Sequence, residues 1–267
     1  MYCRMILLRS ILFNIAFYIN LIGLMVFGLP VLLLGRRGGI IMCQTWARTS
    51  LWLLETIAGL RVEFRGVENI RKGAMLIAPK HQSMLETFAM TVKLDDFSYI
   101  VKKELTWIPF FGWYLAGAHQ VAVDRTKGRA ALMEAAARAR AAVAEGRQIF
   151  IFPEGTRRPV GAPPAYKFGV TFIYADSAVT CLPVAMNTGL FWPRRSFLRR
   201  PGTTVIEFLE PIDPGLDRTV FSTLLQQRVE EASGRLNEEA FARDPGLKAY
   251  WAPRMAAAAL APPLRGG

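Results

Sequence analysis

One uncharged run of 25 residues, from Ile11 to Gly35, limits what the N-terminus of this chain can fold into. A helix needs about 20 apolar residues to cross the hydrocarbon core of a bilayer, so this run is long enough to enter a membrane. Arg4 and Arg9 precede it, as basic residues precede a secretory signal, but the run is too long for a signal and no small-residue cleavage site follows it. The sequence therefore predicts an N-terminal segment that contacts lipid.

Basic residues flank both ends of this run, with Arg36 and Arg37 on the far side. Because cytoplasmic flanks are enriched in Lys and Arg, the charges do not orient a single span. A re-entrant or interfacial two-helix hairpin keeps both flanks on one side, and we favour it over a span. The expected features are breaks at Gly23, Gly28 and Pro30 and a second, amphipathic helix over residues 40–60 with interfacial Trp46 and Trp52.

The net charge of +12 predicts an anionic partner. The basic residues are scattered and form no recognised nucleic-acid-binding module, and such a module would leave the apolar N-terminus unexplained, so anionic lipid is favoured over nucleic acid. The three cysteines and two histidines show no metal-ligand or redox spacing. We therefore expect no metal and no cofactor.

Beyond Gly59 the long helical pattern gives way to short apolar segments that alternate with helices. This alternation predicts an α/β domain with a central mixed β-sheet flanked by helices. The predicted strands are residues 61–66, 74–79, 97–101, 119–125, 148–152, 179–186 and 203–212, and the predicted helices are residues 84–93, 128–146 and 219–241.

The pattern divides the chain into three parts. Residues 1–59 form the membrane-anchoring hairpin, residues 60–245 the α/β domain, and residues 246–267 a C-terminal tail. The tail is rich in Ala, Pro and Gly toward its end, so we expect residues 253–267 to be disordered.

One of the two histidines, His81, follows the predicted strand 74–79 and precedes a helix. Ligands of α/β sheets bind beyond the carboxyl ends of the strands, so this is a position suited to catalysis. Glu86 can contact the His81 imidazole only if the helix begins between them, which Ser83 as N-cap allows. Glu86 then orients His81 as a general base. Alternatively, Ser83 and Glu86 form only a capping box.

No serine or cysteine lies in a nucleophile-elbow pattern, so a covalent acyl-enzyme is not indicated. The base is instead expected to deprotonate a hydroxyl of the substrate.

A second candidate site is the sequence FPEGTR, residues 152–157, where a buried strand is followed by Glu154, Gly155, Thr156 and Arg157. Arg157, together with Arg125 at the end of another strand, offers planar guanidinium groups for a phosphate. Alternatively, this segment is an ordinary turn with solvent-facing arginines.

In order and spacing, HQSMLE, the VDR strand end, FPEGTR and LPVAMNTG resemble the four motifs of the 1-acyl-glycerol-3-phosphate acyltransferase family. The resemblance covers roughly residues 60–215. It implies the glycerolipid acyltransferase fold behind an N-terminal two-helix membrane motif. It also implies transfer of a fatty acyl group from acyl-CoA or acyl-carrier protein to the sn-2 hydroxyl of lysophosphatidic acid, which makes phosphatidic acid.

The resemblance also implies a role for each matching residue. It gives His81 as general base and Glu86 as its acid partner, Arg125 and Arg157 as phosphate ligands, Glu154, Gly155 and Thr156 as the rest of the third motif, and Pro183 on the acyl-donor side. Two positions depart from the family pattern. Glu86 stands where the family usually has Asp, and Lys80 precedes His81 where Asn is common.

This reading places the protein at the cytoplasmic face of the inner membrane, with a lysophospholipid acceptor, an acyl donor and an anionic bilayer as its partners. Two alternatives remain at this stage. One is an acyltransferase for another lysolipid, such as a lyso-ornithine lipid, and the other is a non-catalytic protein that binds phosphatidic acid at the membrane.

Overall fold

A computed structural model describes residues 2–124, 126 and 128–260 of the chain, with the side chains of residues 2 and 3 excepted. Its centre is a mixed seven-stranded sheet with the strand order β1-β7-β6-β2-β5-β3-β4. Neighbouring strands are parallel except for β6 and β7, which are antiparallel. The predicted α/β fold with a central mixed sheet is confirmed.

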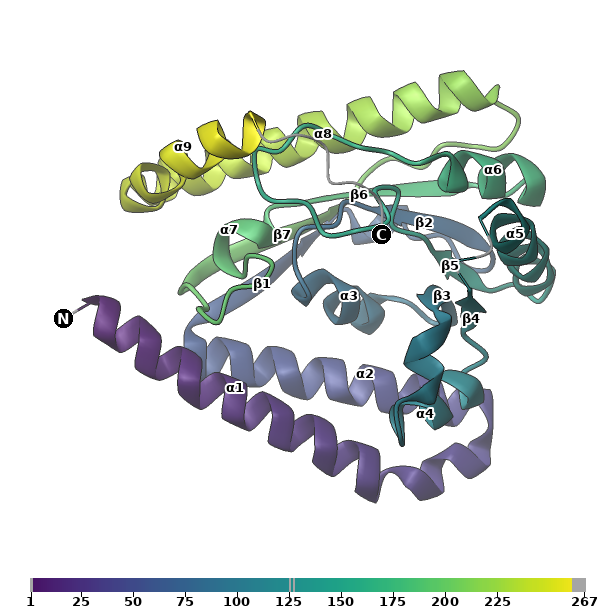
Figure 1. Cartoon of the computed structure of the whole chain (residues 1–267), viewed down its shortest axis with the longest axis horizontal. Helices are drawn as coiled ribbons and strands as arrows, with labels where there is room; N and C mark the ends of the chain where they lie inside the picture. Colours follow the sequence, from purple (N-terminus) through teal and green to yellow (C-terminus); the bar gives the residue numbers. More distant parts are fainter. Residues whose placement is uncertain (1, 125, 127, 261–267) are drawn as a thin grey trace.

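The strands lie close to their predicted positions, and the helices connect them (Figure 1). The strands are β1 (Leu60–Arg65), β2 (Met75–Pro79), β3 (Phe97–Lys102), β4 (Val121–Val123), β5 (Gln148–Phe150), β6 (Cys181–Met186) and β7 (Gly202–Phe208). The α-helices are α1 (Tyr2–Phe27), α2 (Arg36–Leu53), α3 (Leu85–Ala89), α4 (Phe111–Gly117), α5 (Arg129–Ala144), α6 (Phe168–Ser177), α7 (Thr188–Phe191), α8 (Arg218–Arg243) and α9 (Pro245–Ala259). The shorter 3-10 and π segments are η1 (Leu29–Leu34), η2 (Leu54–Ala58), η3 (Val67–Asn69), η4 (Met90–Lys93) and η5 (Lys103–Trp107).

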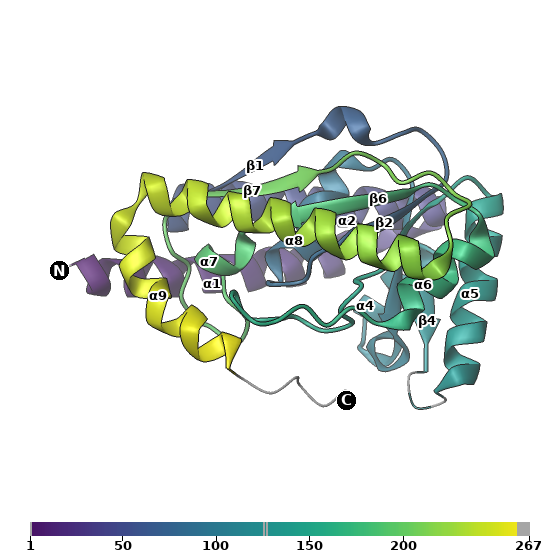
Figure 2. The ribbon, with the colours of Figure 1, turned by 90° about the horizontal axis from the view of Figure 1, so that it is seen from above.

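Helices cover both faces of the sheet, and the central strand β2 shows why. Its side chains alternate between the faces, as the two-residue repeat of a strand requires. Met75 and Ile77 pack in the cluster that contains residues of α2 and α3, whereas Leu76 and Ala78 pack in the cluster that contains residues of α5, α6 and α8. Figure 2 shows α8 crossing above the strands. Because both faces are buried, β2 is apolar at every position.

The parallel strands β2, β6, β5, β3 and β4 end at the same edge of the sheet. The HQSMLE pattern follows β2, the FPEGTR pattern follows β5, and the LPVAMNTG pattern begins within β6 and ends just after it. The topology therefore brings three of the four family-like motifs to one side of the molecule.

The N-terminal hairpin is present, and it is docked against the α/β domain (Figure 1). Helix α1 continues past Gly23 and ends at Phe27, so Gly23 does not break it, whereas Gly28 and Pro30 lie at the turn. Residues Arg4–Phe27 are long and apolar enough to cross a membrane by length and composition, although a signal sequence or a buried core helix passes the same test.

The sequence predicted Trp46 at the membrane–water interface, but its ring packs inside the protein. Its ring packs between Phe17 of α1 and Phe88 of α3, with ring centroids 5.6 and 5.0 Å away. Trp52, on the other side of α2, is exposed. The amphipathic pattern of residues 40–60 therefore reflects a helix that packs on the protein with one face.

The expectation of disorder from residue 253 onward is wrong for residues 253–259, which belong to α9. Leu247 and Trp251 bury this helix against the core, and the Trp251 indole donates a hydrogen bond to the carbonyl of Leu190. Composition alone misses this contact, because two buried side chains position a helix whose remainder is rich in alanine. Residues 261–267 lie outside the described residues.

Buried polar groups connect α1 to the domain. The Arg199 guanidinium stacks on the Trp192 ring at 3.8 Å and donates a hydrogen bond to Oδ1 of Asn14 at 3.0 Å. The backbone N–H of Arg199 donates to Oγ of Ser10 at 2.9 Å. Burial lowers the pKa of Arg199 to about 10. Since an unpaired buried charge is costly, these contacts favour the docked position of α1.

Replacing Asn14 with Ala should lower stability by about 1–3 kcal/mol, because the buried Arg199 guanidinium loses a hydrogen-bond acceptor. Thermal unfolding of the full-length protein in mild detergent measures this change. The matched control is Ile15→Ala, at an exposed position next to Asn14 on the same helix. Equal melting temperatures for the two variants would show that this contact does not hold α1 in place.

Candidate active site

The segment after β2 brings His81 and Glu86 together. Nδ1 of His81 lies 3.0 Å from Oε1 of Glu86, and the Glu86 side chain has no solvent exposure. Helix α3 begins at Leu85, with Met84 rather than Ser83 at its N-cap position. Both residues can therefore converge although they are five positions apart, because His81 lies before the helix.

The Glu86 carboxylate also satisfies the backbone at the start of this helix. Oε1 accepts hydrogen bonds from the N–H groups of Gln82 at 2.8 Å and Ser83 at 2.6 Å. The Ser83 hydroxyl accepts from the N–H of Leu85 at 3.1 Å. The two readings of Glu86, as a capping residue and as the partner of His81, are thus compatible, because one carboxylate makes both contacts.

Phe152 fixes the plane of the His81 ring. The two rings are stacked, with centroids 3.8 Å apart and an interplanar angle of 22°. Since Nδ1 faces Glu86, Nε2 is the ring nitrogen that can accept a proton from a substrate. Phe152 opens the FPEGTR pattern, directly before Pro153 and Glu154, but the sequence alone predicted no role for its ring.

A residue missed at the sequence level, Thr188, completes the hydrogen bonding of Glu86. Its hydroxyl donates to Oε2 of Glu86 at 2.8 Å, and the next N–H, that of Gly189, donates to Oε1 of Gln82 at 3.1 Å. Gly189 is required here, because a Cβ atom would lie 2.7 Å from Val160. The segment after β6 is thereby held against the segment that carries His81.

The FPEGTR segment lies against the same loop. The N–H of Arg158 donates to the carbonyl of His81 at 2.7 Å, and Gly155 has a φ of 66°, a left-handed conformation that glycine adopts readily. Glu154 is buried, whereas Thr156 and Arg157 are exposed. The segment therefore separates into a buried carboxylate and an exposed guanidinium.

Lys80, where the family commonly has Asn, takes part in a buried ionic network. Its ammonium group lies 2.5 Å from Oε1 of Glu230 on α8 and 3.8 Å from Oε1 of Glu154. The Tyr166 hydroxyl donates to the same oxygen of Glu230 at 3.1 Å. Lys80 thus connects the segment after β2, which carries His81, to α8.

The other predicted site residues are placed differently. Pro183 is buried within β6, beside Ala78 of β2, and so lies in the sheet interior. Arg125 lies outside the described residues. His119, which is not among the predicted site residues, is exposed, and its carbonyl accepts a hydrogen bond from Arg147 at 3.2 Å.

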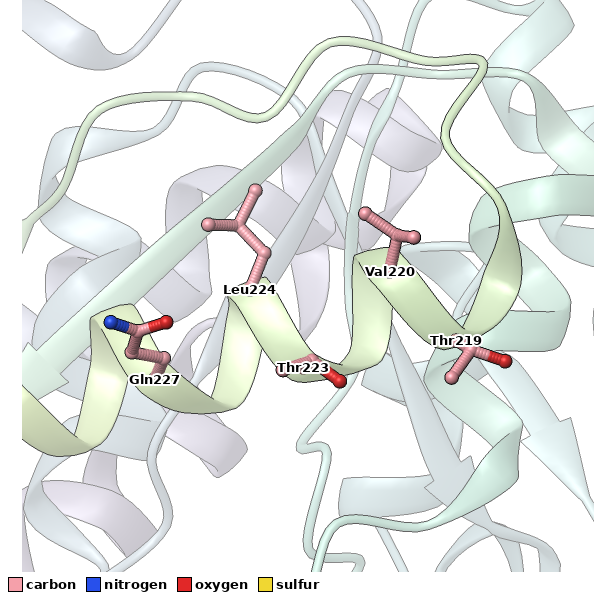
Figure 3. A pocket seen from close by; sticks show the side chains of 5 residues that line it. All are labelled: Thr219, Val220, Thr223, Leu224 and Gln227. Carbon is pink, nitrogen blue, oxygen red and sulfur yellow. The ribbon is translucent and has the colours of Figure 1, made fainter.

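No cluster of three or more His, Cys, Asp or Glu side chains suited to a metal occurs in the part of the chain that the structure describes. A shallow depression elsewhere is lined only by α8 residues Thr219, Val220, Thr223, Leu224 and Gln227 (Figure 3). Because a single helix lines it and none of the motifs reaches it, we assign it no function.

Sequence comparison agrees with this geometry. Residues 61–187 match the acyltransferase family model, a range that contains His81, Glu86 and the FPEGTR segment. The chain carries an acyltransferase-family domain. This domain extends from β1 to the segment after β6, and the hairpin and helices α8 and α9 lie outside the matched range.

Curated relatives are similar over the same region. A 1-acyl-sn-glycerol-3-phosphate acyltransferase of Pseudomonas aeruginosa is 39% identical over 160 residues, which cover 60% of this chain and 62% of the relative. One from Cocos nucifera is 28% identical, covering 66% and 56%. The chain thus matches less than two thirds of the length of these relatives.

A solved structure extends the similarity in fold to most of the chain. The crystal structure of the 1-acyl-sn-glycerophosphate (LPA) acyltransferase PlsC from Thermotoga maritima superposes with a TM-score of 0.73. The match covers 86% of this chain and 97% of that one at 24% identity. The acyltransferase-family domain therefore shares its fold with that enzyme.

The buried carboxylate of Glu154 generates a prediction about pH and stability. Burial raises its pKa above the ordinary value of 4.5, although Lys80 opposes this shift. Ionisation of Glu154 therefore costs more in the folded than in the unfolded protein, and its contribution to stability is lost as the pH rises through the folded pKa. Gln cannot ionise, so the melting temperature of Glu154→Gln relative to the unmodified protein should increase from pH 4 to pH 8.

Melting temperatures across this pH range test the prediction. Glu210→Gln, at an exposed position, is the matched control and should show no such trend. A pH-independent difference between Glu154→Gln and the unmodified protein would mean that the ion pairs with Lys80 and Arg158 offset the effect of burial, and a difference that falls with pH would mean that they outweigh it.

Proposed function

We propose that this protein transfers a fatty acyl group from a thioester donor, acyl-CoA or acyl-carrier protein, to the sn-2 hydroxyl of lysophosphatidic acid. The observation that carries the proposal is the His81–Glu86 pair, in which one ring nitrogen is held by a buried carboxylate and the other is left for a substrate. The acceptor follows from the curated relatives, which are named 1-acyl-sn-glycerol-3-phosphate acyltransferases.

In the proposed reaction, Nε2 of His81 removes the proton of the acceptor hydroxyl, and the oxygen attacks the thioester carbonyl. The tetrahedral intermediate then collapses, the carbon–sulfur bond breaks, and the imidazolium returns the proton to the leaving thiolate. Glu86 accepts a hydrogen bond from Nδ1–H throughout and stabilises the imidazolium. No metal or redox cofactor is needed for the atoms to balance.

The cysteines support direct transfer rather than a covalent acyl-enzyme. Burial raises the pKa of Cys43 to about 11, and it raises the pKa of Cys181 further. Both thiols therefore stay protonated near neutral pH, whereas the thiolate is the nucleophilic form. None of the hydrogen bonds between described residues joins either thiol to His81, and the side chain of Cys3 lies outside the described residues.

We further propose that the outer face of the hairpin lies on a lipid bilayer at the cytoplasmic side of the inner membrane. Helix α1 buries Phe13 and Phe17 against the domain but exposes a continuous apolar set on its other side. Its most exposed members, with the adjoining turn, are Ile19, Ile22, Phe27, Leu33 and Leu34. A helix docked on one side in this way suits an interfacial position better than a span.

The aromatic segment of residues 107–113 extends this face. Trp107 is 69% exposed and Trp113 is 56% exposed. The segment lies beside the hairpin, since the hydroxyl of Tyr114 donates to the carbonyls of Leu24 and Met25 at 3.3 and 3.1 Å. Tryptophan is enriched where membrane and water meet, so the two rings fit the same bilayer surface.

Two variants of the base and its support test the chemistry. His81→Ala should reduce acyl transfer by about 10²–10⁴-fold, as loss of a general base does. Thr188→Val should reduce kcat by about 10–100-fold with little change in KM, because one hydrogen bond to the Glu86 carboxylate is lost. The release of free thiol from acyl-CoA in the presence of lysophosphatidic acid measures both effects.

Matched controls are available for each variant. His119→Ala removes the other histidine, which is exposed, and should retain full activity. Thr188→Ser keeps the hydroxyl and should restore kcat. Undiminished turnover by His81→Ala would show that His81 is not the general base. Lipid binding without any thiol release by the unmodified protein would favour a non-catalytic phosphatidic-acid-binding protein instead.

Trp107→Ala with Trp113→Ala should weaken binding to anionic vesicles by about tenfold or more. Each ring that leaves the bilayer loses roughly 1–2 kcal/mol of apolar transfer free energy. Co-sedimentation with phosphatidylglycerol-containing vesicles measures the change. Val220→Ala, at an exposed apolar position on α8, is the control. Equal vesicle binding by all three proteins would place the aromatic segment away from the membrane.

A further inference from the structure

Three arginines from two separate loops form a cluster beside the segment that carries His81. Arg157 lies between β5 and α6, and Arg194 and Arg195 lie between α7 and β7. The guanidinium Nη1 of Arg194 donates a hydrogen bond to the carbonyl of Arg157 at 2.5 Å. We call these three residues the arginine cluster.

The positive charge of this cluster is not neutralised within the described residues. None of the three arginines is in an ion pair there, whereas Arg65 and Arg235 each pair with two glutamates. Burial, followed by the charges of Arg195, Arg157 and Arg158, lowers the pKa of Arg194. Like charges held together without carboxylates are characteristic of a site that binds an anion from solution.

The backbone at Arg195 is consistent with this role. Its φ is 55°, in the left-handed region that residues other than glycine rarely adopt. Strained conformations of this kind cluster at ligand-binding sites, where the surrounding structure maintains them. The Arg195 side chain is exposed, so it is accessible to a ligand.

Both loops of the cluster are held against the segment that carries His81. The N–H of Arg158, next to Arg157, donates to the carbonyl of His81 at 2.7 Å. Helix α7, which precedes the other loop, is held in the same way, because the N–H of Gly189 donates to Oε1 of Gln82 at 3.1 Å. The cluster is therefore connected on both sides to the candidate base.

We propose that Arg194 and Arg195, together with Arg157, bind the phosphate ester of a substrate. This inference rests on the proposed function and adds Arg194 and Arg195, which lie outside the FPEGTR segment. Two guanidinium groups can bind several oxygens of one phosphate at once. The phosphate belongs either to the lysophosphatidic acid acceptor or to the acyl donor, since both carry one.

Initial rates of the full-length protein in mixed micelles test the proposal. Lysophosphatidic acid is varied at saturating acyl-CoA, and then acyl-CoA at saturating lysophosphatidic acid. The main variant is Arg194→Gln with Arg195→Asn. Gln still offers a donor to the carbonyl of Arg157, and Asn tolerates a left-handed backbone. The control is Arg243→Gln, which removes one exposed charge at the end of α8.

We expect KM for one substrate to rise at least tenfold with kcat within about twofold. A rise for lysophosphatidic acid assigns the cluster to the acceptor phosphate, and a rise for acyl-CoA assigns it to the donor. Unchanged KM values, or a fall in kcat alone, would overturn the proposal and leave Arg194 with a structural role. Unchanged KM values with weaker binding to anionic vesicles would show a membrane contact instead, which also overturns it.

Two further measurements keep the test decisive. If the double variant does not fold, Arg195→Asn alone is used, because none of the hydrogen bonds between described residues involves the Arg195 side chain.

If the unmodified protein transfers no acyl group, the proposed function fails but phosphate binding remains testable. Glycerol 3-phosphate or adenosine 3′,5′-bisphosphate should then raise the melting temperature of the unmodified protein by several degrees more than that of the variant. Equal shifts would overturn the arginine cluster as a binding site.

Discussion

The carboxylate of Glu86 accepts hydrogen bonds from two parts of the chain that are about a hundred residues apart in sequence. It receives the backbone N–H groups of Gln82 and Ser83, the His81 ring and the Thr188 hydroxyl, and it is shielded from water. A buried charge is tolerated only when it is satisfied in this way. The conformation of the His81 loop, the start of α3 and the position of the segment after β6 therefore depend on one another.

The sheet makes this convergence possible. Strands β2, β5 and β6 are neighbours and parallel, so the segments after them meet at one edge. His81, Phe152 and Thr188 each come from a different one of these segments. Two of the cationic groups at this edge are used differently, since the Lys80 ammonium is buried against Glu230 whereas Arg157 remains exposed and unneutralised within the described chain.

The hairpin is part of the folded protein as well as its candidate lipid contact. Phe17 packs against Phe88 of α3, and Asn14 holds the buried guanidinium of Arg199. The opposite side of α1 is apolar and exposed. In the proposed arrangement the exposed side of this helix faces the bilayer, which would fix the position of the acyltransferase-family domain relative to the membrane.

The sequence by itself determined the order of the strands along the chain, the mixed sheet and the proximity of His81 and Glu86, because apolar periodicity and short-range capping depend on neighbouring residues. Only the tertiary structure decided which distant groups meet: Thr188 with Glu86, Phe152 with His81, Lys80 with Glu230 and Arg194 with Arg157. It also reversed two expectations, the interfacial Trp46 and the disorder of residues 253–259, because each depends on what lies across a packed interface. Local patterns carry no information about such partners, since strand order and helix docking are set by the burial of the whole core.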